Sequence, residues 1–327
     1  MTSTPSPVFL HLLADRHLAP SAVWLACDEN SHDALTALAN DPSFMALVAG
    51  FPCLIPARQA AGLPPDLLSN LQVSGCEVIE DTFFQRADEA QQPALRSPAL
   101  WLDGHWFVAP PPHPAGAQSA SRTLSMKLLQ LDTADAETRD IEAVLRQDPT
   151  LSYHLLRLVN SLGMGVSRRI TSFSQAILIL GRAQLKRWMN LMLFAARTDD
   201  YRGPMLLAAV AMRSRTMELL AKECGMDRAD QEQAFMAGMF SMLGILFGTP
   251  VDELIKPLQL SDTLVSAVLR REGDLGQMLQ LMELTMQRDV SGVAALLLEM
   301  QLTPAQFTLA SVQACQWMLD IAREVQG

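Results

Sequence analysis

Residues 148–197 read DPTLSYHLLRLVNSLGMGVSRRITSFSQAILILGRAQLKRWMNLMLFAAR, and this stretch decides the fold of the chain. Its pattern predicts three helices separated by two short breaks. Asp148 is placed to cap the first helix, in which leucines recur at helical spacing. Ser172 and Gln175 have the capping-box spacing for the second helix, which ends at Gly181. The third is apolar on most sides, so we expect it to be largely buried.

The same stretch is a basic island in an acidic protein. It holds seven arginine and lysine residues, and no aspartate or glutamate occurs between Pro149 and Thr198. The whole chain has a net charge of −10, so the remainder carries −17, from 18 basic and 35 acidic residues. Two interpretations stay open: a surface for an anion or an acidic partner, or one half of a set of internal salt bridges. We favour the second, because net charge informs about association rather than fold.

Composition bounds the class of protein. A length of 327 residues suggests two domains, and 49% apolar with 18% charged residues suits a soluble chain with sizeable cores. No apolar run reaches the ~18 residues of a membrane span, and the N-terminus lacks the pattern of a secretory signal. The five cysteines form no CxxC pair, which predicts reduced thiols in the cytoplasm and no zinc site. An isoelectric point near 5.1 argues against general nucleic-acid binding.

The N-terminal part mixes strand and helix signals, and residues 1–109 are predicted to form a small α/β domain. Runs typical of strands cover residues 22–28 and 76–84, and a helix is expected to begin after Asn30 or Ser31. Asp103-Gly104 lies between two apolar runs and is typical of a hairpin turn.

A linker rich in proline and small residues follows at residues 110–121. Beyond it, residues 122–327 show only helical patterns and are predicted to form an all-α domain. Within this domain, QEQAFMAGMFSMLGILF (231–247) reads as one helix. A long last helix is expected to begin at Thr303 and Pro304.

The histidines and carboxylates offer little chemistry. All six histidines lie at or before His154, although a helical metallohydrolase usually takes several metal ligands from histidine. The doublet His32-Asp33 reads as a helix start, because the helix dipole favours an acidic residue in the first turn. Carboxylate pairs such as Asp199-Asp200 are expected to be solvated or to cap helices. No phosphate-binding loop or nucleophile motif occurs, so we expect neither enzyme activity nor a cofactor.

Methionine is concentrated in the helical part, where 16 of the 18 lie at position 126 or later. Two stripes recur at helical spacing: Met236, Met239 and Met242, and then Met278, Met282 and Met286. Such stripes usually belong to the core. The alternative is an adaptable groove for partner helices.

The opening stretch resembles the signature of the HDOD domain, a helical relative of the HD metal-dependent phosphohydrolases. The resembling segments are DPTLSYHLLRLVNS (148–161), ITSFSQAILILG (170–181) and LKRWMNLMLFA (185–195), which occur in the family's order. The resemblance covers residues 120–327. It implies a fold class of an α+β N-terminal unit followed by an all-α HD-like helical domain.

The same resemblance locates metal ligands that this chain lacks. In HD hydrolases a helix like FMAGMFSMLG (235–244) carries the His-Asp doublet, and the two places fall here on Ser241 and Met242. Neither side chain suits the hard metal ion that a phosphate-cleaving site needs. We therefore expect a domain without metal and without hydrolase activity.

The segment 240–282 is similar to an HDOD subgroup in which the domain follows an EAL domain, the fold that hydrolyses or senses cyclic di-GMP. GHWFVAPPP (104–112) resembles the strand that ends an EAL domain. The N-terminal part has about half the length of an EAL barrel and no Glu-Ala-Leu triplet. The resemblance thus implies a truncated, degenerate EAL remnant.

The leading hypothesis is a non-catalytic signalling or regulatory protein that acts on unidentified signalling proteins through its metal-free HDOD domain. The candidate interaction surface is the basic island, represented by Arg157, Asn160, Arg168, Arg169 and Arg187. The alternative is a sensor of cyclic di-GMP or another phosphate ligand, bound by guanidinium forks of the island. A residual phosphodiesterase is the third hypothesis.

Overall fold

The computed structural model describes residues 5–88, 92–111, 200–256 and 260–326. The stretch 148–197 lies outside these residues, with its basic island, its three expected helices and His154. Most of the expected linker at 110–121 lies outside them as well. The domain boundaries therefore stay predictions.

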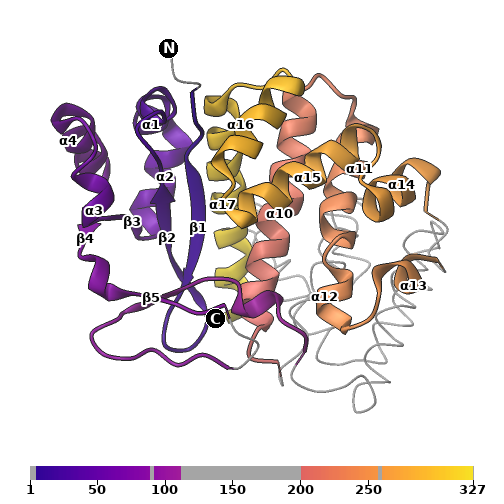
Figure 1. Cartoon of the computed structure of the whole chain (residues 1–327), viewed down its shortest axis with the longest axis horizontal. Helices are drawn as coiled ribbons and strands as arrows, with labels where there is room; N and C mark the ends of the chain where they lie inside the picture. The colour runs from indigo at the N-terminus through magenta and orange to yellow at the C-terminus, as the bar shows by residue number, and fades with distance from the viewer. Residues whose placement is uncertain (1–4, 89–91, 112–199, 257–259, 327) are drawn as a thin grey trace, which may run out of the picture.

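The N-terminal part is a mixed six-stranded sheet with the strand order β4-β3-β2-β1-β6-β5 (Figure 1). The strands are β1 (Phe9–Ala14), β2 (Pro20–Ala26), β3 (Cys53–Pro56), β4 (Glu77–Ile79), β5 (Phe84–Arg86) and β6 (Trp101–Asp103). Strand β1 is antiparallel to both of its neighbours, β2 and β6. The remaining neighbours are parallel pairs, so the chain must cross over between them.

Helices connect the parallel strands β2, β3 and β4. They are α1 (His32–Ala39) and α2 (Pro42–Gly50) between β2 and β3, and α3 (Ala57–Ala60) and α4 (Pro65–Ser74) between β3 and β4. Short 3-10 turns, η1 (Asp81–Phe83) and η2 (Trp106–Val108), precede β5 and follow β6. The prediction of an α/β arrangement for this part is confirmed at the level of strand and helix content.

The individual predictions for the N-terminal part are confirmed in part. The strand predicted at 22–28 is confirmed as β2, and His32 begins α1 with Asp33 in its first turn, as expected. The run 76–84 is divided among β4, η1 and the first residue of β5. Strand β1 was not predicted.

The hairpin turn predicted at Asp103-Gly104 is wrong. Strand β6 ends at Asp103, and the chain then enters η2 instead of a second strand. Gly104 has a φ of +116°, and a Cβ atom there would lie 2.2 Å from the carbonyl oxygen of Ala87. The glycine is needed for this close approach of two backbone segments, and this explains why a turn-like dipeptide occurs where no hairpin forms.

The described residues from 200 onward form helices and connecting loops, in agreement with the predicted helical domain. The helices are α10 (Gly203–Glu223), α11 (Arg228–Phe240), α12 (Leu243–Phe247), α13 (Val251–Ile255), α14 (Asp262–Arg270), α15 (Gly273–Gln287), α16 (Val290–Glu299) and α17 (Pro304–Gln326). The side chains of Asp227, Ser261 and Asp289 cap α11, α14 and α16. Thr303 and Gln306 form a capping box at the predicted start of α17.

Two details of the helical part differ from the predictions. Helix α16 was not predicted. The segment 231–247 is not one helix, since it breaks between α11 and α12 at Ser241-Met242. Ser241 Oγ donates to the carbonyl oxygen of Gly238 over 2.7 Å, and such a bond competes with the helical pattern.

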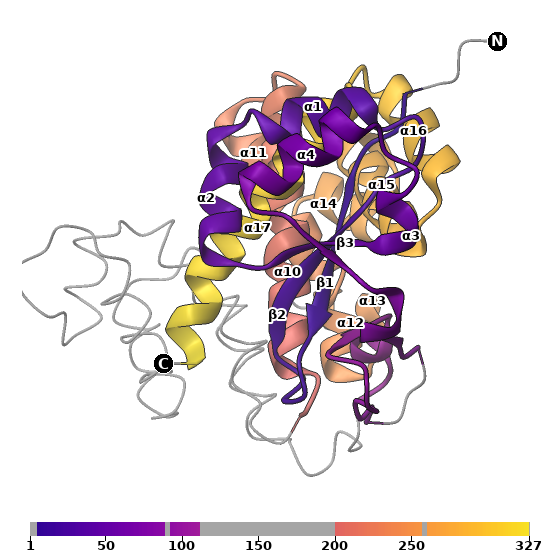
Figure 2. The ribbon, with the colours of Figure 1, turned by 90° about the vertical axis from the view of Figure 1, so that its left-hand side faces the viewer.

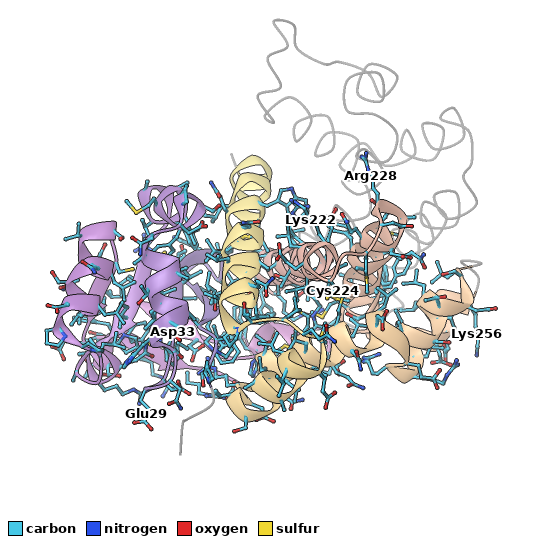
Figure 3. The ribbon with its side chains drawn as sticks, turned by 90° about the horizontal axis from the view of Figure 1, so that it is seen from above. Glu29, Asp33, Lys222, Cys224, Arg228 and Lys256 are labelled. Carbon is cyan, nitrogen blue, oxygen red and sulfur yellow. The ribbon has the colours of Figure 1, made fainter. Side chains whose placement is uncertain are left out.

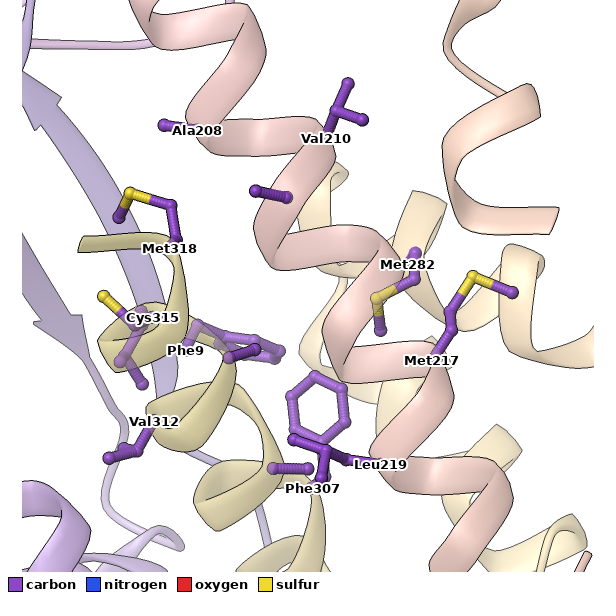
Figure 4. Close-up of a cluster of buried hydrophobic side chains, with 14 of the residues drawn as sticks. Phe9, Ala208, Val210, Met217, Leu219, Met282, Phe307, Val312, Cys315 and Met318 are labelled. Atoms are coloured by element: carbon purple, nitrogen blue, oxygen red, sulfur yellow. The ribbon is translucent and has the colours of Figure 1, made fainter. Parts of the chain in front are cut away.

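Helix α17 joins the two parts. It lies between the N-terminal unit and α10 (Figures 1–3), and it packs on α1, α2 and β1 as well as on α10. The N–H of Val8 donates to Thr308 Oγ1 over 2.9 Å, which ties the chain before β1 to this helix. Buried side chains from Val8 to Leu319 form one continuous core (Figure 4). The sheet and the helices therefore share a core.

No single described helix is long and apolar enough to cross a membrane, and α16 with the first part of α17 would meet that test only as a pair bent by 105°.

Helices α10 and α11 approach closely at Gly238, where a Cβ atom would lie 2.8 Å from the Cα atom of Ser214. The five cysteines are free thiols.

Candidate functional site: a cavity between the sheet and the helices

A cavity of about 140 Å³ lies where the sheet meets the helices. Its described walls come from β1 and the turn after β6 on one side, and from α10, α15, α17 and the end of α11 on the other. The apolar part of the wall is made mainly of Phe107, Met212, Met242, Met282, Met286 and Phe307. The charged and imidazole groups come from His11, Asp103, His105, Arg213 and Arg288. Both methionine stripes thus reach this cavity, while most of their members are buried.

Ser241 and Met242, which the family resemblance places at the HD doublet, lie at this cavity. Met242 is 2% exposed and lines it, and Ser241 lies beside it at the break between α11 and α12. Arg213, on α10, donates from Nη1 to Ser241 Oγ over 3.1 Å. A guanidinium group therefore lies against Ser241, one of the two residues that the family resemblance places at the doublet.

Arg213 has no carboxylate in ion-pair contact among the described residues. The nearby Glu283 is already held by Arg271, with 2.6 Å between Oε1 and Nη2. Burial of the Arg213 guanidinium lowers its pKa to about 10, against the opposing field of Glu283 and with a small contribution from Arg271. The group remains protonated at neutral pH, so the cavity wall carries a positive charge that has no direct counter-ion among the described residues.

Arg288 connects the helices to the sheet. It is the residue after α15, with a φ of +60°, and its Nη2 atom lies 2.5 Å from Asp103 Oδ1 at the end of β6. Its guanidinium carbon also lies 4.7 Å from the centre of the Trp24 ring on β2, a cation–π arrangement. The Asp103 side chain is 8% exposed, so this charge pair is largely removed from water.

His11 of β1 forms another part of the wall. Its ring lies between those of Phe9 and Trp24, with centroids 6.1 and 5.6 Å away. Its Nε2 atom is buried and has no hydrogen-bond partner among the described residues. Burial, followed by the positive charge of Arg288, lowers the pKa of His11 to about 3. The imidazole is therefore neutral throughout the physiological range.

The depressed pKa of His11 predicts acid lability. The unfolded chain takes up this proton near pH 6.5, whereas the folded chain resists it down to about pH 3. The difference in His11 protonation therefore leaves the free energy of unfolding unchanged above pH 6.5. Between pH 6.5 and about pH 3 it lowers the free energy of unfolding, by up to about 1.4 kcal/mol for each pH unit. Urea unfolding at several pH values should show a shallower pH dependence for His11→Phe than for the wild type.

His17→Phe is the matched control for this measurement, because His17 is exposed in the turn between β1 and β2. It should leave the pH dependence as in the wild type. Equal slopes for His11→Phe and the wild type between pH 6.5 and pH 4.5 would contradict the assignment to His11.

The residues predicted as an interaction surface, Arg157, Asn160, Arg168, Arg169 and Arg187, lie outside the described residues. That prediction is therefore untested. Within the described ranges no three His, Cys, Asp or Glu side chains gather as a metal site would need. The cavity residues were missed by sequence reasoning, since His11, Asp103, Arg213 and Arg288 belong to four distant segments without a shared motif.

Asp200 also differs from its expectation as a solvated or capping residue. It is 3% exposed, and its Oδ2 atom lies 2.7 Å from Nη2 of Arg202, which is itself fully buried. Arg202 further donates to the carbonyl oxygens of Ala109 and Ile245. This ion pair thus fixes the chain that follows η2 against the start of α10 and the short α12.

The comparison with known families agrees with this architecture. Residues 121–298 match the family model described as the HDOD domain. This match covers more than half of the chain, so the protein belongs to the HDOD family.

Individual relatives add detail. The chain is 30% identical over 237 residues to a protein named cyclic di-GMP phosphodiesterase CdgJ, from Vibrio cholerae; this covers 72% of the chain and 54% of CdgJ. It is 28% identical over 159 residues to the uncharacterized protein YuxH of Bacillus subtilis, covering 48% and 38%. The chain thus spans about half, or less, of the curated relatives it matches. A crystal structure of a putative phosphohydrolase from Shewanella amazonensis aligns with a TM-score of 0.44 at 15% identity, over 64% of this chain and 98% of the other.

Proposed function

We propose that this protein is a non-catalytic regulatory protein that acts by binding other proteins through its HDOD domain. Membership of the HDOD family and the similarity to CdgJ support a role in signal transduction. CdgJ is named as a phosphodiesterase, but this chain covers only 54% of it, so the activity of the whole relative is not carried over.

The observation that carries the non-catalytic part is the contact between Arg213 and Ser241. A hydroxyl and a thioether stand at the two places of the metal-binding doublet, and neither is an anionic ligand for a divalent ion. The fixed positive charge of Arg213, 3.1 Å from Ser241 Oγ, would also repel a divalent cation held there. Both features favour binding over metal-assisted hydrolysis.

The N-terminal unit is proposed to derive from an EAL domain. The parallel neighbours β2, β3 and β4 with helices between them repeat the unit from which (β/α) barrels are built. The alignment with CdgJ covers 72% of the chain, which is more than the part from residue 121 onward, so it reaches into the N-terminal unit. Six strands form a partial barrel at most.

The test uses the full chain as bait in affinity capture from a lysate of the source organism. We expect Arg168→Glu/Arg169→Glu to lose the partners that the wild type recovers, while its melting temperature stays the same. Arg16→Glu/Arg228→Glu changes the net charge equally at two exposed positions in the described part and should keep those partners. If the island variant recovers the same partners as the wild type, the island is not the interaction surface.

A second function is favoured by the name of CdgJ alone: sensing of cyclic di-GMP without hydrolysis. Calorimetry with a panel of cyclic dinucleotides separates the two. Saturable heats would support the sensor. Turnover of cyclic di-GMP that depends on added manganese or magnesium, or a stoichiometric metal in the purified protein, would contradict the non-catalytic proposal.

A further inference from the structure

The cavity between the sheet and the helices has the size and the lining of a small-molecule site. At about 140 Å³ it is comparable to an engineered cavity of ~150 Å³ that binds benzene. Phenylalanine and methionine side chains make up most of the apolar wall, and methionine adapts to irregular shapes.

The polar groups at the cavity point to an anion. Arg213 has five N–H donors, and among the described residues only Ser241 Oγ accepts a hydrogen bond from its side chain. Enclosing a charged group without a counter-ion is costly, and an anion in the cavity would offset this cost. Arg288 and Asp103 neutralise each other, so among the described residues of the wall one positive charge, that of Arg213, has no ion-pair partner.

Two further groups in the wall have no partner among the described residues. The Nε2 atom of His11 and the Nε atom of Arg288 are buried without a hydrogen bond among the described residues, and both residues line the cavity. A neutral imidazole nitrogen donates or accepts according to its tautomer. The cavity thus presents a guanidinium fork and unused hydrogen-bonding groups beside an apolar wall.

We propose that this cavity binds a small monocarboxylate whose apolar part is about the size of a benzene ring. The carboxylate pairs with Arg213 in a two-pronged hydrogen bond, which the planar guanidinium favours. The apolar part lies against the methionines and phenylalanines. One unpaired positive charge matches a monoanion, whereas a strongly hydrated phosphate dianion is a poor match for a mostly apolar wall.

Such a ligand contacts both parts of the molecule, because the wall combines β1 with α10, α15 and α17. Binding would stabilise the docking of the sheet on the helices by mass action. The inference goes beyond the proposed function and fails separately from it, since it requires no partner protein and no knowledge of the basic island.

The experiment measures binding of benzoate to the full chain by calorimetry and by the shift in melting temperature. Benzyl alcohol serves as a neutral probe of similar size, and inorganic phosphate as an anion without an apolar part. We expect saturable benzoate binding that raises the melting temperature, and weaker binding of both other probes. Arg213→Met should weaken the binding of benzoate by at least about tenfold and leave the binding of benzyl alcohol unchanged.

Arg213→Lys provides a second variant, because it keeps the charge and loses the planar fork; it should bind benzoate with intermediate affinity. Ala209→Phe places a ring at the cavity wall and should reduce the binding of both organic probes. Three results would each overturn the proposal: no saturable benzoate binding, benzoate binding unchanged in Arg213→Met, or phosphate binding tighter than benzoate.

Discussion

Replacing Asp200 with alanine is expected to lower the free energy of unfolding by about 3–5 kcal/mol. The side chains of Asp200 and Arg202 are 1% and 0% exposed, so the variant leaves a buried guanidinium without its carboxylate. Arg202 would retain its contacts with the carbonyl oxygens of Ala109 and Ile245, which are dipoles and only partly offset the charge. Urea unfolding followed by circular dichroism measures the loss.

Asp252→Ala is the matched control, because its pair with Lys256 is exposed and 3.4 Å long. Such a surface pair contributes about 0–1 kcal/mol. Equal losses in the two variants would contradict the buried character of the Asp200 pair. Replacing both partners, as in Asp200→Leu/Arg202→Met, should cost much less than Asp200→Ala, since no charge is then left buried.

Arg288→Met is expected to cost about 2–4 kcal/mol, for two reasons. The variant leaves the Asp103 carboxylate, 8% exposed, without its partner, and it removes the cation–π contact with Trp24. Methionine keeps an unbranched, flexible side chain and meets the same backbone penalty at the positive φ of this position. The loss is therefore attributable to the charge.

A second readout distinguishes this assignment from general damage. Arg288 lowers the pKa of His11, whereas Asp103 raises it, so the variant should raise the His11 pKa from its depressed value. An NMR titration of the His11 ring measures this change. Arg270→Met is the control, because it removes an exposed ion pair with Glu272. It should change the free energy of unfolding by no more than about 1 kcal/mol and leave the His11 titration unchanged. An unchanged His11 titration in Arg288→Met would contradict the placement of the Arg288 charge near His11.

The predictable part of the fold was the part that depends on neighbouring residues. Helical periodicity predicted that the residues from 200 onward are helical, and Thr303 with Pro304 predicted the start of α17, because a cap and an apolar stripe act within one or two turns of helix. Likewise, the run of apolar residues at 22–28 gave β2. The family signature, together with the family match, gave the class of the helical domain.

Predictions failed where a local signal serves a distant contact. Asp103-Gly104 looks like a hairpin turn, but its glycine allows the backbone to approach Ala87. Asp200 looks like a loop carboxylate, but it neutralises a buried arginine. Strand β1 has a weak alternating pattern, because both faces are partly covered, so it did not stand out from the sequence.

The sequence by itself determined that the chain combines an α+β unit with an HDOD domain, and it predicts that Ser241 and Met242 stand at the two places of the metal-binding doublet. Only the tertiary structure brought Arg213 to Ser241, Arg288 to Asp103 and Trp24, and the His11 ring to the same cavity. The physical reason is that charge pairing and cavity shape arise between segments up to hundreds of residues apart. These contacts are set by how α17 and α15 pack on the sheet, which no local pattern encodes.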